Sequence, residues 1–181
     1  LGSKDFELIS ELLKLLKDPS EQVREEAAIV LGTVVSETIA VNTISSSEAE
    51  KLILELRELL ENKNKVIREA AATAIGEIGS PVKELIPQLL KLLNDEDDRV
   101  RQAAAIAIGT MALEGEELIP QLKPLFEHKD WRVRHAAAIT ISTMGSEGEE
   151  LIPQLKPLFK DKDWRVRRAA AIAISLSLIH I

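Results

Sequence analysis

Cysteine and tyrosine are absent from this chain of 181 residues, and aromatic residues make up only 3% of it. Without cysteine there is no disulfide framework and no cysteine-ligated metal site, which is typical of a reducing compartment. No apolar run approaches the roughly 18 residues that a membrane-spanning helix needs. The first residues do not combine a basic start, an apolar core and a small-residue cleavage site, as a signal peptide does. We therefore expect a cytoplasmic protein with no membrane partner.

Positive charge is also in short supply, and it is unevenly distributed. The chain has 23 basic and 30 acidic side chains, a net charge of −7. Residues 1–60 contain 6 basic and 12 acidic side chains, whereas residues 114–181 contain 10 of each. Nucleic-acid binding needs local positive charge against the phosphates. We therefore expect no nucleic-acid partner.

What the chain does contain is a repeat. Residues 117–141 read ELIPQLKPLFEHKDWRVRHAAAITI and residues 150–174 read ELIPQLKPLFKDKDWRVRRAAAIAI, with 21 of 25 positions identical. Similar copies begin at residues 84, 51 and 7, so the spacing is 33 residues except for 44 after the first copy. This pattern predicts one domain over residues 1–181, with repeats at 5–36, 48–79, 81–112, 114–145 and 147–175. The extra residues predict a longer loop at 36–47.

Each repeat is expected to form two helices, which we name helix A and helix B. Helix A has leucine and isoleucine at helical spacing, and a polar turn follows it. Helix B starts after a preferred N-cap residue in every copy: Ser20, Asn64, Asp97, Asp130 and Asp163. Helix B then buries one apolar and small-residue stripe, which includes Ala27, Ala71, Ala104, Ala137 and Ala170. The sequence thus predicts an all-α solenoid of about five antiparallel helix pairs.

Proline and glycine mark the expected helix ends. Three prolines fall in the first turn of helix A, where the missing N–H costs nothing: Pro87, Pro120 and Pro153. Pro124 and Pro157 lie four residues further on and predict a kink. Glycines that we expect in the turns after helix B are Gly32, Gly76, Gly79, Gly109 and Gly145.

Together these residues carry a resemblance to a family. A helix with Leu-x-Pro-x-Leu, a turn with aspartate and an Ala-rich helix opened by Val-Arg resemble the HEAT repeat. The short unit is similar to phycobilisome-lyase-type HEAT-like repeats, and residues 130–134 and 163–167 resemble repeats of the scaffold subunit of protein phosphatase 2A. The resemblance implies that A helices form a convex side and B helices a concave side. It also implies a structural Asp/Arg ladder between repeats: Arg24, Arg68, Arg101, Arg134 and Arg167, with Asp18, Asp95, Asp161, Asp97, Asp130 and Asp163 as partners.

Catalytic groups are not apparent. The three histidines do not repeat with a partner residue, the paired carboxylates lie in expected turns, and no Gly-rich phosphate loop is present. We therefore expect no enzyme activity, no cofactor and no metal site.

One helix face departs from simple repetition. We call it the B-helix strip, formed by the first and fifth residues after each N-cap: Glu21/Glu25, Lys65/Glu69, Asp98/Gln102, Trp131/His135 and Trp164/Arg168. With the adjacent arginines, the candidate partner-binding residues are Trp131, Arg132, His135, Trp164, Arg165 and Arg168, because exposed Trp and Arg dominate binding hot spots. The alternative is that each Trp packs over its own A–B turn.

The leading hypothesis is a scaffold or adaptor that binds a partner protein or peptide on the concave face, and an acidic or phosphorylated segment would suit its arginines. The alternatives are an accessory domain or subunit of an enzyme, such as a lyase-type or phosphatase complex, and a structural spacer. Residues 176–181 form an atypical tail that resembles translated adapter sequence, an artefact. The uncapped apolar end indicates a fragment that could self-associate through its ends.

Overall fold

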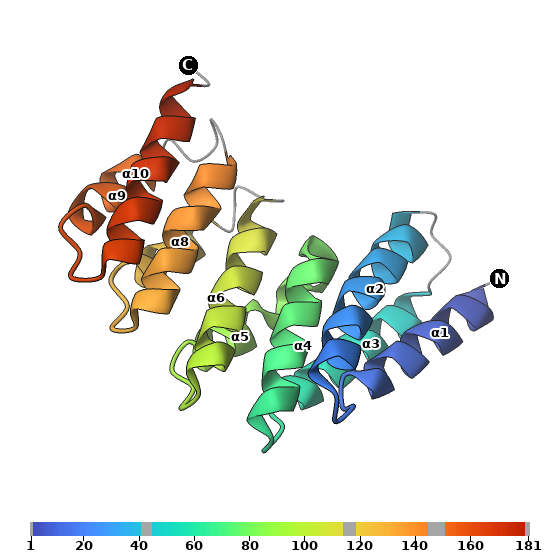
Figure 1. Ribbon diagram of the computed structural model, residues 1–181. Helices are drawn as coiled ribbons and strands as arrows, with labels where there is room; N and C mark the ends of the chain where they lie inside the picture. The colour runs from blue at the N-terminus through green and yellow to red at the C-terminus, as the bar shows by residue number, and fades with distance from the viewer. Residues whose placement is uncertain (1, 41–44, 114–118, 145–150, 180–181) are drawn as a thin grey trace. The chain divides into compact units, whose positions relative to one another are not determined.

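Helices account for all regular secondary structure in the part of the chain that the structure describes. The structure is a computed structural model that describes residues 2–40, 45–113, 119–144 and 151–179. Its helices are α1 (Gly2–Leu15), α2 (Glu21–Ala40), α3 (Ser46–Leu60), α4 (Lys65–Ile78), the 3-10 helix η1 (Ser80–Leu85), α5 (Ile86–Leu92), α6 (Asp98–Leu113), α7 (Ile119–Phe126), α8 (Trp131–Met144), α9 (Ile152–Leu158) and α10 (Trp164–Ile179) (Figure 1). They fall into five pairs, one in each predicted repeat, which confirms an all-α fold of the solenoid class.

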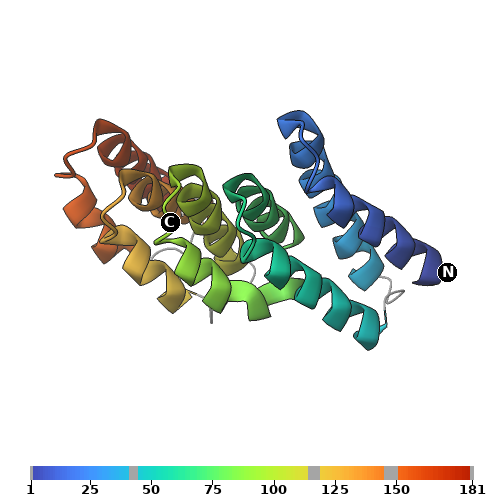
Figure 2. The same ribbon diagram turned by 90° about the horizontal axis from the view of Figure 1, so that it is seen from below.

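The chain comprises two compact units, residues 1–107 and 108–181, and the single domain over residues 1–181 stays a prediction. Each repeat in such an array rests mainly on its neighbours. In unit 1, α2 packs against α4, while α1, α3 and α5 make the second layer (Figures 1 and 2). In unit 2, α8 packs against α10, and α7 and α9 form the layer behind them.

The predicted N-caps set the start of every B helix. Helices α2, α4, α6, α8 and α10 each begin one residue after the predicted cap. Asn64 Oδ1 accepts a hydrogen bond from the backbone N of Val66 at 3.0 Å, and Asp97 Oδ1 accepts one from that of Arg99 at 3.0 Å. These bonds satisfy backbone donors that have no partner inside the helix.

Small side chains let the B helices pack closely. The predicted alanines Ala27, Ala71, Ala104, Ala137 and Ala170 are all at most 3% exposed. Around them lie leucine and isoleucine from both layers, including Leu56, Ile75, Leu89 and Leu155, none of which is exposed. Burial of this aliphatic surface stabilises each unit by roughly 25 cal/mol per Å².

Three glycines were wrongly predicted to lie in turns. Gly32, Gly76 and Gly109 lie inside α2, α4 and α6, and Gly145 is outside the described residues. A Cβ added at Gly76 would stand 3.1 Å from the Cα of Ala107, so this glycine allows α4 and α6 to approach. Gly79 does follow helix B with φ 74°, as predicted, a conformation that glycine adopts without strain.

The predicted loop at 36–47 is shorter than expected. Helix α2 continues to Ala40, and α3 starts at Ser46 after a capping box between Ser45 and Glu48. Most of the extra residues therefore lengthen α2, because residues 36–40 include strong helix formers and no proline or glycine. Residues 41–44 lie outside the described part. At the other end, residues 176–179 of the predicted tail continue α10.

Proline positions agree with the prediction at the start of helix A. Pro87, Pro120 and Pro153 are the second residues of α5, α7 and α9. Pro124 and Pro157 lie inside α7 and α9, which end two residues and one residue after them. The kink stays a prediction.

Candidate functional site

The candidate binding residues of unit 2 lie in and next to the first turns of α8 and α10. Asp130 Oδ1 and Asp163 Oδ1 accept hydrogen bonds from the backbone N of Arg132 and Arg165, each at 2.9 Å. These caps fix the first turn of each helix, from which Trp131 and Trp164 project. Because both repeats use the same cap, their side chains are repeated along one face.

The indole ring of Trp131 contacts two arginine guanidinium groups, and we call this cluster the stack. The guanidinium carbon of Arg165 lies 3.4 Å from the centroid of the Trp131 ring, and that of Arg132 lies 4.8 Å from it. Arg165 is held there by Asp163, with Nη2 donating to Oδ2 at 2.8 Å and Nε donating to Oδ1 at 3.0 Å. Arginine over an indole face is a cation–π contact. Trp131 is therefore half-buried, and it packs against Arg165 of the next repeat as well as against Arg132 beside it.

His135 extends this stack. Its ring meets that of Trp131 edge to face, with centroids 6.1 Å apart and an interplanar angle of 71°. Burial lowers the pKa of His135 below its usual range, and the nearby charge of Arg165 lowers it further. His135 is consequently neutral near pH 7, since even an unperturbed histidine titrates near 6.5.

A groove of about 270 Å³ runs beside the stack, between α8 and α10. Its walls are His135, Ile139 and Ser142 from α8 and Trp164, Arg165, Arg168, Ala169 and Ile172 from α10. Three of its apolar residues are open to solvent: Trp164 is 59%, Ile139 45% and Ile172 42% exposed. Small-molecule sites usually measure roughly 300–1,000 Å³, so this groove suits one or two side chains of a partner.

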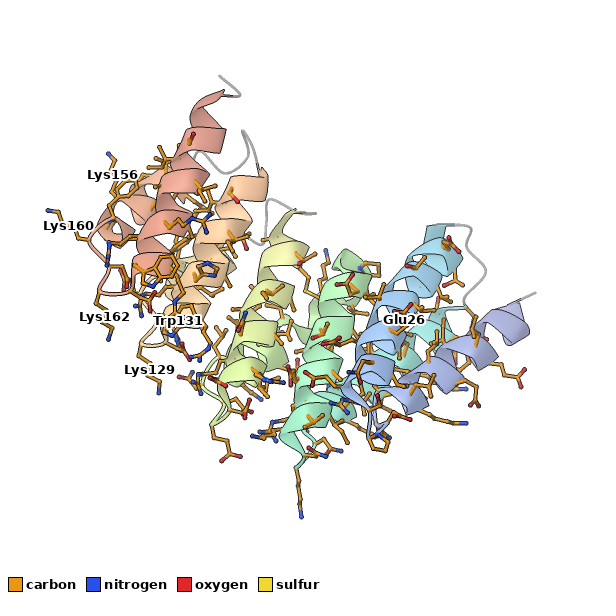
Figure 3. The ribbon with its side chains drawn as sticks, viewed as in Figure 1. Glu26, Lys129, Trp131, Lys156, Lys160 and Lys162 are labelled. Carbon is orange, nitrogen blue, oxygen red and sulfur yellow. The ribbon has the colours of Figure 1, made fainter. Side chains whose placement is uncertain are left out.

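Two arginines, Arg165 and Arg168, line the groove, and no carboxylate is among its lining residues. Arg168 is exposed, and no hydrogen bond or ion pair links it to another described residue. In Figure 3, Lys129 and Lys162 extend from the turns before α8 and α10. An anionic group would be attracted to this edge of unit 2.

The structure thus gathers all six predicted binding residues and adds residues that the sequence analysis missed. Trp131, Arg132 and Arg165 form the stack, while Trp164 and Arg168 line the groove. Ile139 and Ile172, one turn further along the same face, were missed. The signal was present, because the ninth residue after the N-cap is Ile in four of the five copies: Ile29, Ile106, Ile139 and Ile172, with Thr73 in the second.

The predicted ladder arginines have a shared structural contact. Nη1 of each donates to two backbone carbonyls in the turn before its own helix B: Arg24 to Asp18 and Pro19, Arg68 to Asn62 and Lys63, Arg101 to Asp95 and Glu96, Arg134 to His128 and Lys129, and Arg167 to Asp161 and Lys162. These carbonyls belong to the turn that follows the last residue of helix A. Each arginine therefore closes its own A–B turn.

Two of these arginines also reach the following repeat. Arg68 Nε and Nη2 donate to both oxygens of Asp95 at 2.8 Å, and Arg134 Nε and Nη2 donate to those of Asp161 at 2.6 and 2.8 Å. The Arg134 hydrogen bonds hold the pKa of Asp161 below its usual range. The accepting carboxylates, Asp95 and Asp161, lie two residues before the N-caps Asp97 and Asp163.

The capping aspartates form different ion pairs. Asp97 Oδ2 accepts from Lys65 Nζ at 2.7 Å, across repeats. Asp163 pairs with Arg165 of its own helix, whose hydrogen bonds lower the pKa of Asp163 to about 2. Asp130 lies 3.7 Å from Arg132. Asp97 therefore caps its helix and also pairs with a cation of the preceding repeat, whereas Asp163 caps its helix and pairs within the same helix.

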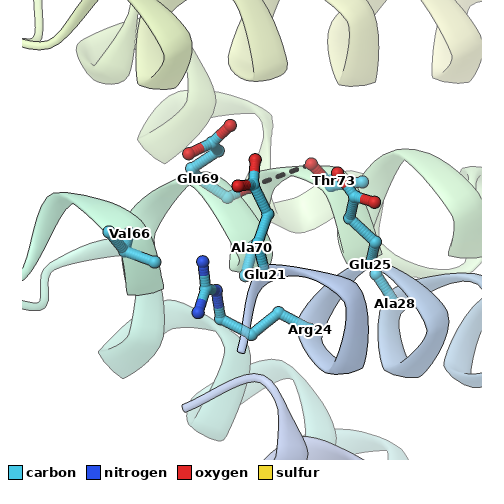
Figure 4. A pocket seen from close by; sticks show the side chains of 8 residues that line it. All are labelled: Glu21, Arg24, Glu25, Ala28, Val66, Glu69, Ala70 and Thr73. Carbon is cyan, nitrogen blue, oxygen red and sulfur yellow. Dashed lines mark hydrogen bonds between the residues drawn. The ribbon is translucent and has the colours of Figure 1, made fainter. Parts of the chain in front are cut away.

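The same strip in unit 1 has the opposite charge. A smaller groove of about 100 Å³ lies between α2 and α4, lined partly by Glu21, Glu25 and Glu69 (Figure 4). Arg99 Nη1 of α6 donates to Glu21 Oε1 of α2 at 2.9 Å, past α4. The first turns of the three B helices of unit 1 therefore converge on this side. Burial raises the pKa of Glu69 above its usual range, despite the nearby charge of Arg99.

Among residues 2–40, 45–113, 119–144 and 151–179, no group of three or more His, Asp or Glu side chains could hold a metal ion. His128 lies in a turn, where its Nδ1 accepts from the backbone N of Asp130 at 3.1 Å. His180 lies outside the described residues. Among the described helices, none is long and apolar enough to span a bilayer.

Comparisons with known proteins agree with this geometry. The sequence pattern of HEAT repeats matches residues 9–86 and 86–175. No curated protein sequence matches the chain. An engineered protein of known crystal structure is 21% identical, with 95% of this chain and 80% of that chain covered and a TM-score of 0.57.

Designed armadillo repeat proteins are similar as well. One, solved in complex with the peptide (KR)4, is 24% identical, with 93% of this chain and 81% of that chain covered and a TM-score of 0.55. Another, computationally designed for modular peptide recognition, is 24% identical with the same coverage and a TM-score of 0.52. At these identities the likeness concerns the fold alone, which is typical of protein-binding scaffolds.

Proposed function

Because the chain belongs to the HEAT repeat family, we propose that it is a non-catalytic scaffold that binds a partner protein through the B-helix strip of unit 2. The observation that carries this proposal is the groove beside Trp164, which combines an exposed indole, two exposed isoleucines and an unpaired arginine. Apolar surface rimmed by arginine is a common composition for binding hot spots.

The arrangement of the stack supports the same proposal. Binding costs side-chain entropy whenever flexible groups must be ordered. Asp163 already holds Arg165, which lines the groove and lies over Trp131, so this lining side chain is in place before a partner arrives. A preformed wall lowers the entropic cost of docking a peptide segment.

Selection from a displayed random peptide library tests the proposal. The purified chain is the bait, and enriched peptides are measured by fluorescence anisotropy against the wild type and Trp164→Ala/Arg168→Glu. We expect at least tenfold weaker binding to the variant, since both residues line the groove. Both are exposed, so circular dichroism should show unchanged helicity.

A matched control uses the equivalent strip in unit 1. Glu25→Gln/Ile29→Ser changes exposed residues at the positions that correspond to Arg168 and Ile172 of the groove, and it should leave peptide binding unchanged. If no peptide is enriched, or if enriched peptides bind both variants as well as the wild type, the strip of unit 2 is not a binding site. A structural spacer would then explain the chain better.

A further inference from the structure

We propose that the groove in unit 2 recognises an extended peptide segment that carries one acidic side chain two residues away from one large aliphatic side chain, with the acid on Arg168 and the aliphatic group between Ile139 and Ile172. This inference rests on the proposed function, because it specifies what the same groove binds. It goes further by assigning a separate role to each end of the groove.

The apolar end selects the aliphatic side chain. Ile139, Ala169 and Ile172 provide its surface, and the two isoleucines are almost half exposed without a partner. A cavity of about 270 Å³ admits a leucine or isoleucine. Covering these three residues with an aliphatic side chain removes apolar surface from water on both molecules.

The charged end selects the acid. Arg132 and Arg165 are both placed against Trp131, and Arg165 is neutralised by Asp163. Arg168 is the lining cation that pairs with no described residue, and no carboxylate lines the groove. A peptide carboxylate at Arg168 would therefore meet an available donor with no like charge beside it.

Helix geometry sets the spacing between the two peptide side chains. Arg168 and Ile172 are four residues apart on α10, so they are neighbours about 6 Å apart along one face. In an extended peptide, side chains on one face are two residues apart, or roughly 6.6 Å. The recognised pair is consequently an acid and an aliphatic residue with one residue between them, in either order.

Four labelled peptides distinguish the parts of this proposal. The first has glutamate and leucine with one residue between them. The others replace glutamate by glutamine, glutamate by lysine, or leucine by serine. Titration is followed by the two indole N–H signals in nitrogen-15 NMR spectra, since Trp131 and Trp164 are the only tryptophans. The Glu/Leu peptide should shift the signal of Trp164 far more than that of Trp131.

We expect about fivefold weaker binding without the charge, as for one partly exposed ion pair, and roughly tenfold weaker binding without leucine. Arg168→Glu should reverse the order, binding the Lys/Leu peptide better than the Glu/Leu peptide. Ile172→Ser should weaken all leucine peptides, whereas Ile29→Ser in unit 1 should weaken none.

The outcomes separate the two proposals. If the glutamine peptide binds as well as the glutamate peptide, or if Arg168→Glu fails to reverse the preference, the assignment of an acidic ligand is wrong while library binding to the strip can still hold. If the Glu/Leu peptide leaves the Trp164 signal unchanged, the whole inference is wrong. Loss of library binding alone would overturn the proposed function.

Discussion

Replacing Arg134 by methionine should destabilise unit 2 by much more than the corresponding change at Arg24 destabilises unit 1. Methionine keeps the length of the side chain but removes the guanidinium. Asp161, whose side chain is only 7% exposed, would lose its bidentate cation, and the carbonyls of His128 and Lys129 would lose a donor. A buried ion pair broken on one side costs roughly 3–5 kcal/mol, so we expect about 3 kcal/mol.

The chain contains its own control for this change. Arg24 makes the same two carbonyl hydrogen bonds but, in the following repeat, asparagine occupies the position of Asp161: Asn62. Arg24 is also only half-buried. Arg24→Met should therefore cost about 1 kcal/mol, the net value of ordinary hydrogen bonds. The difference between the two substitutions isolates the contribution of the ion pair to stability.

Urea unfolding measures both variants. Tryptophan fluorescence reports on unit 2 alone, because Trp131 and Trp164 both lie there, while circular dichroism reports on the whole chain. The double variant Arg134→Met/Asp161→Asn should be less destabilised than the sum of its parts, by about 1–3 kcal/mol. Equal losses for Arg134→Met and Arg24→Met would refute the reasoning that the ion pair stabilises the repeat interface.

The other predictions concern packing and pH. Gly76→Val should lower the free energy of unfolding in urea by about 1–3 kcal/mol, because the new side chain would overpack against Ala107. An unchanged free energy of unfolding would contradict the close approach of α4 and α6. Gly79→Ala should lower the free energy of unfolding by roughly 1–3 kcal/mol, because alanine is strained at the positive φ of this position. Wild-type stability of this variant would contradict that strain. The lowered pKa of Asp161 means that its stabilising contribution is complete above about pH 4 and is lost as pH falls through the folded-state pKa. Asp161→Asn should therefore make acid unfolding, followed by tryptophan fluorescence, less steep.

The protonation of His135 should make the affinity for a carboxylate peptide depend on pH. Its pKa is lowered, so it is neutral at pH 7 and gains a charge as pH falls below about 6.5. Arg165 and Arg168 oppose that charge and Asp163 favours it. A carboxylate peptide in the groove would favour the charged form, so its affinity should rise between pH 7 and 5. His135→Gln should abolish this rise, and an unchanged pH profile would contradict the role of His135.

Much of the fold follows from sequence periodicity. Helix B begins one residue after each of the five predicted N-caps. The asparagine and the three aspartates make the capping hydrogen bond, which is a local interaction between residues two or three apart, whereas Ser20 Oγ donates to Gln22 Oε1. The buried alanine positions were likewise correct, since one helix face repeats every turn. The glycines inside α2, α4 and α6 were misassigned, because a glycine that ends a helix and one that admits a neighbouring helix look alike in a sequence.

The sequence by itself determined the helices, their pairing into repeats and the face that would carry Trp131, Trp164 and Arg168. Each of these depends on residues within one repeat, where spacing fixes direction. Only the tertiary structure decided the roles of the two tryptophans. Arg165 of the next repeat covers Trp131, while Trp164 stays open beside Ile139 and Ile172. Which aromatic ring is covered depends on contacts between repeats, and these form only when the helices are stacked in three dimensions.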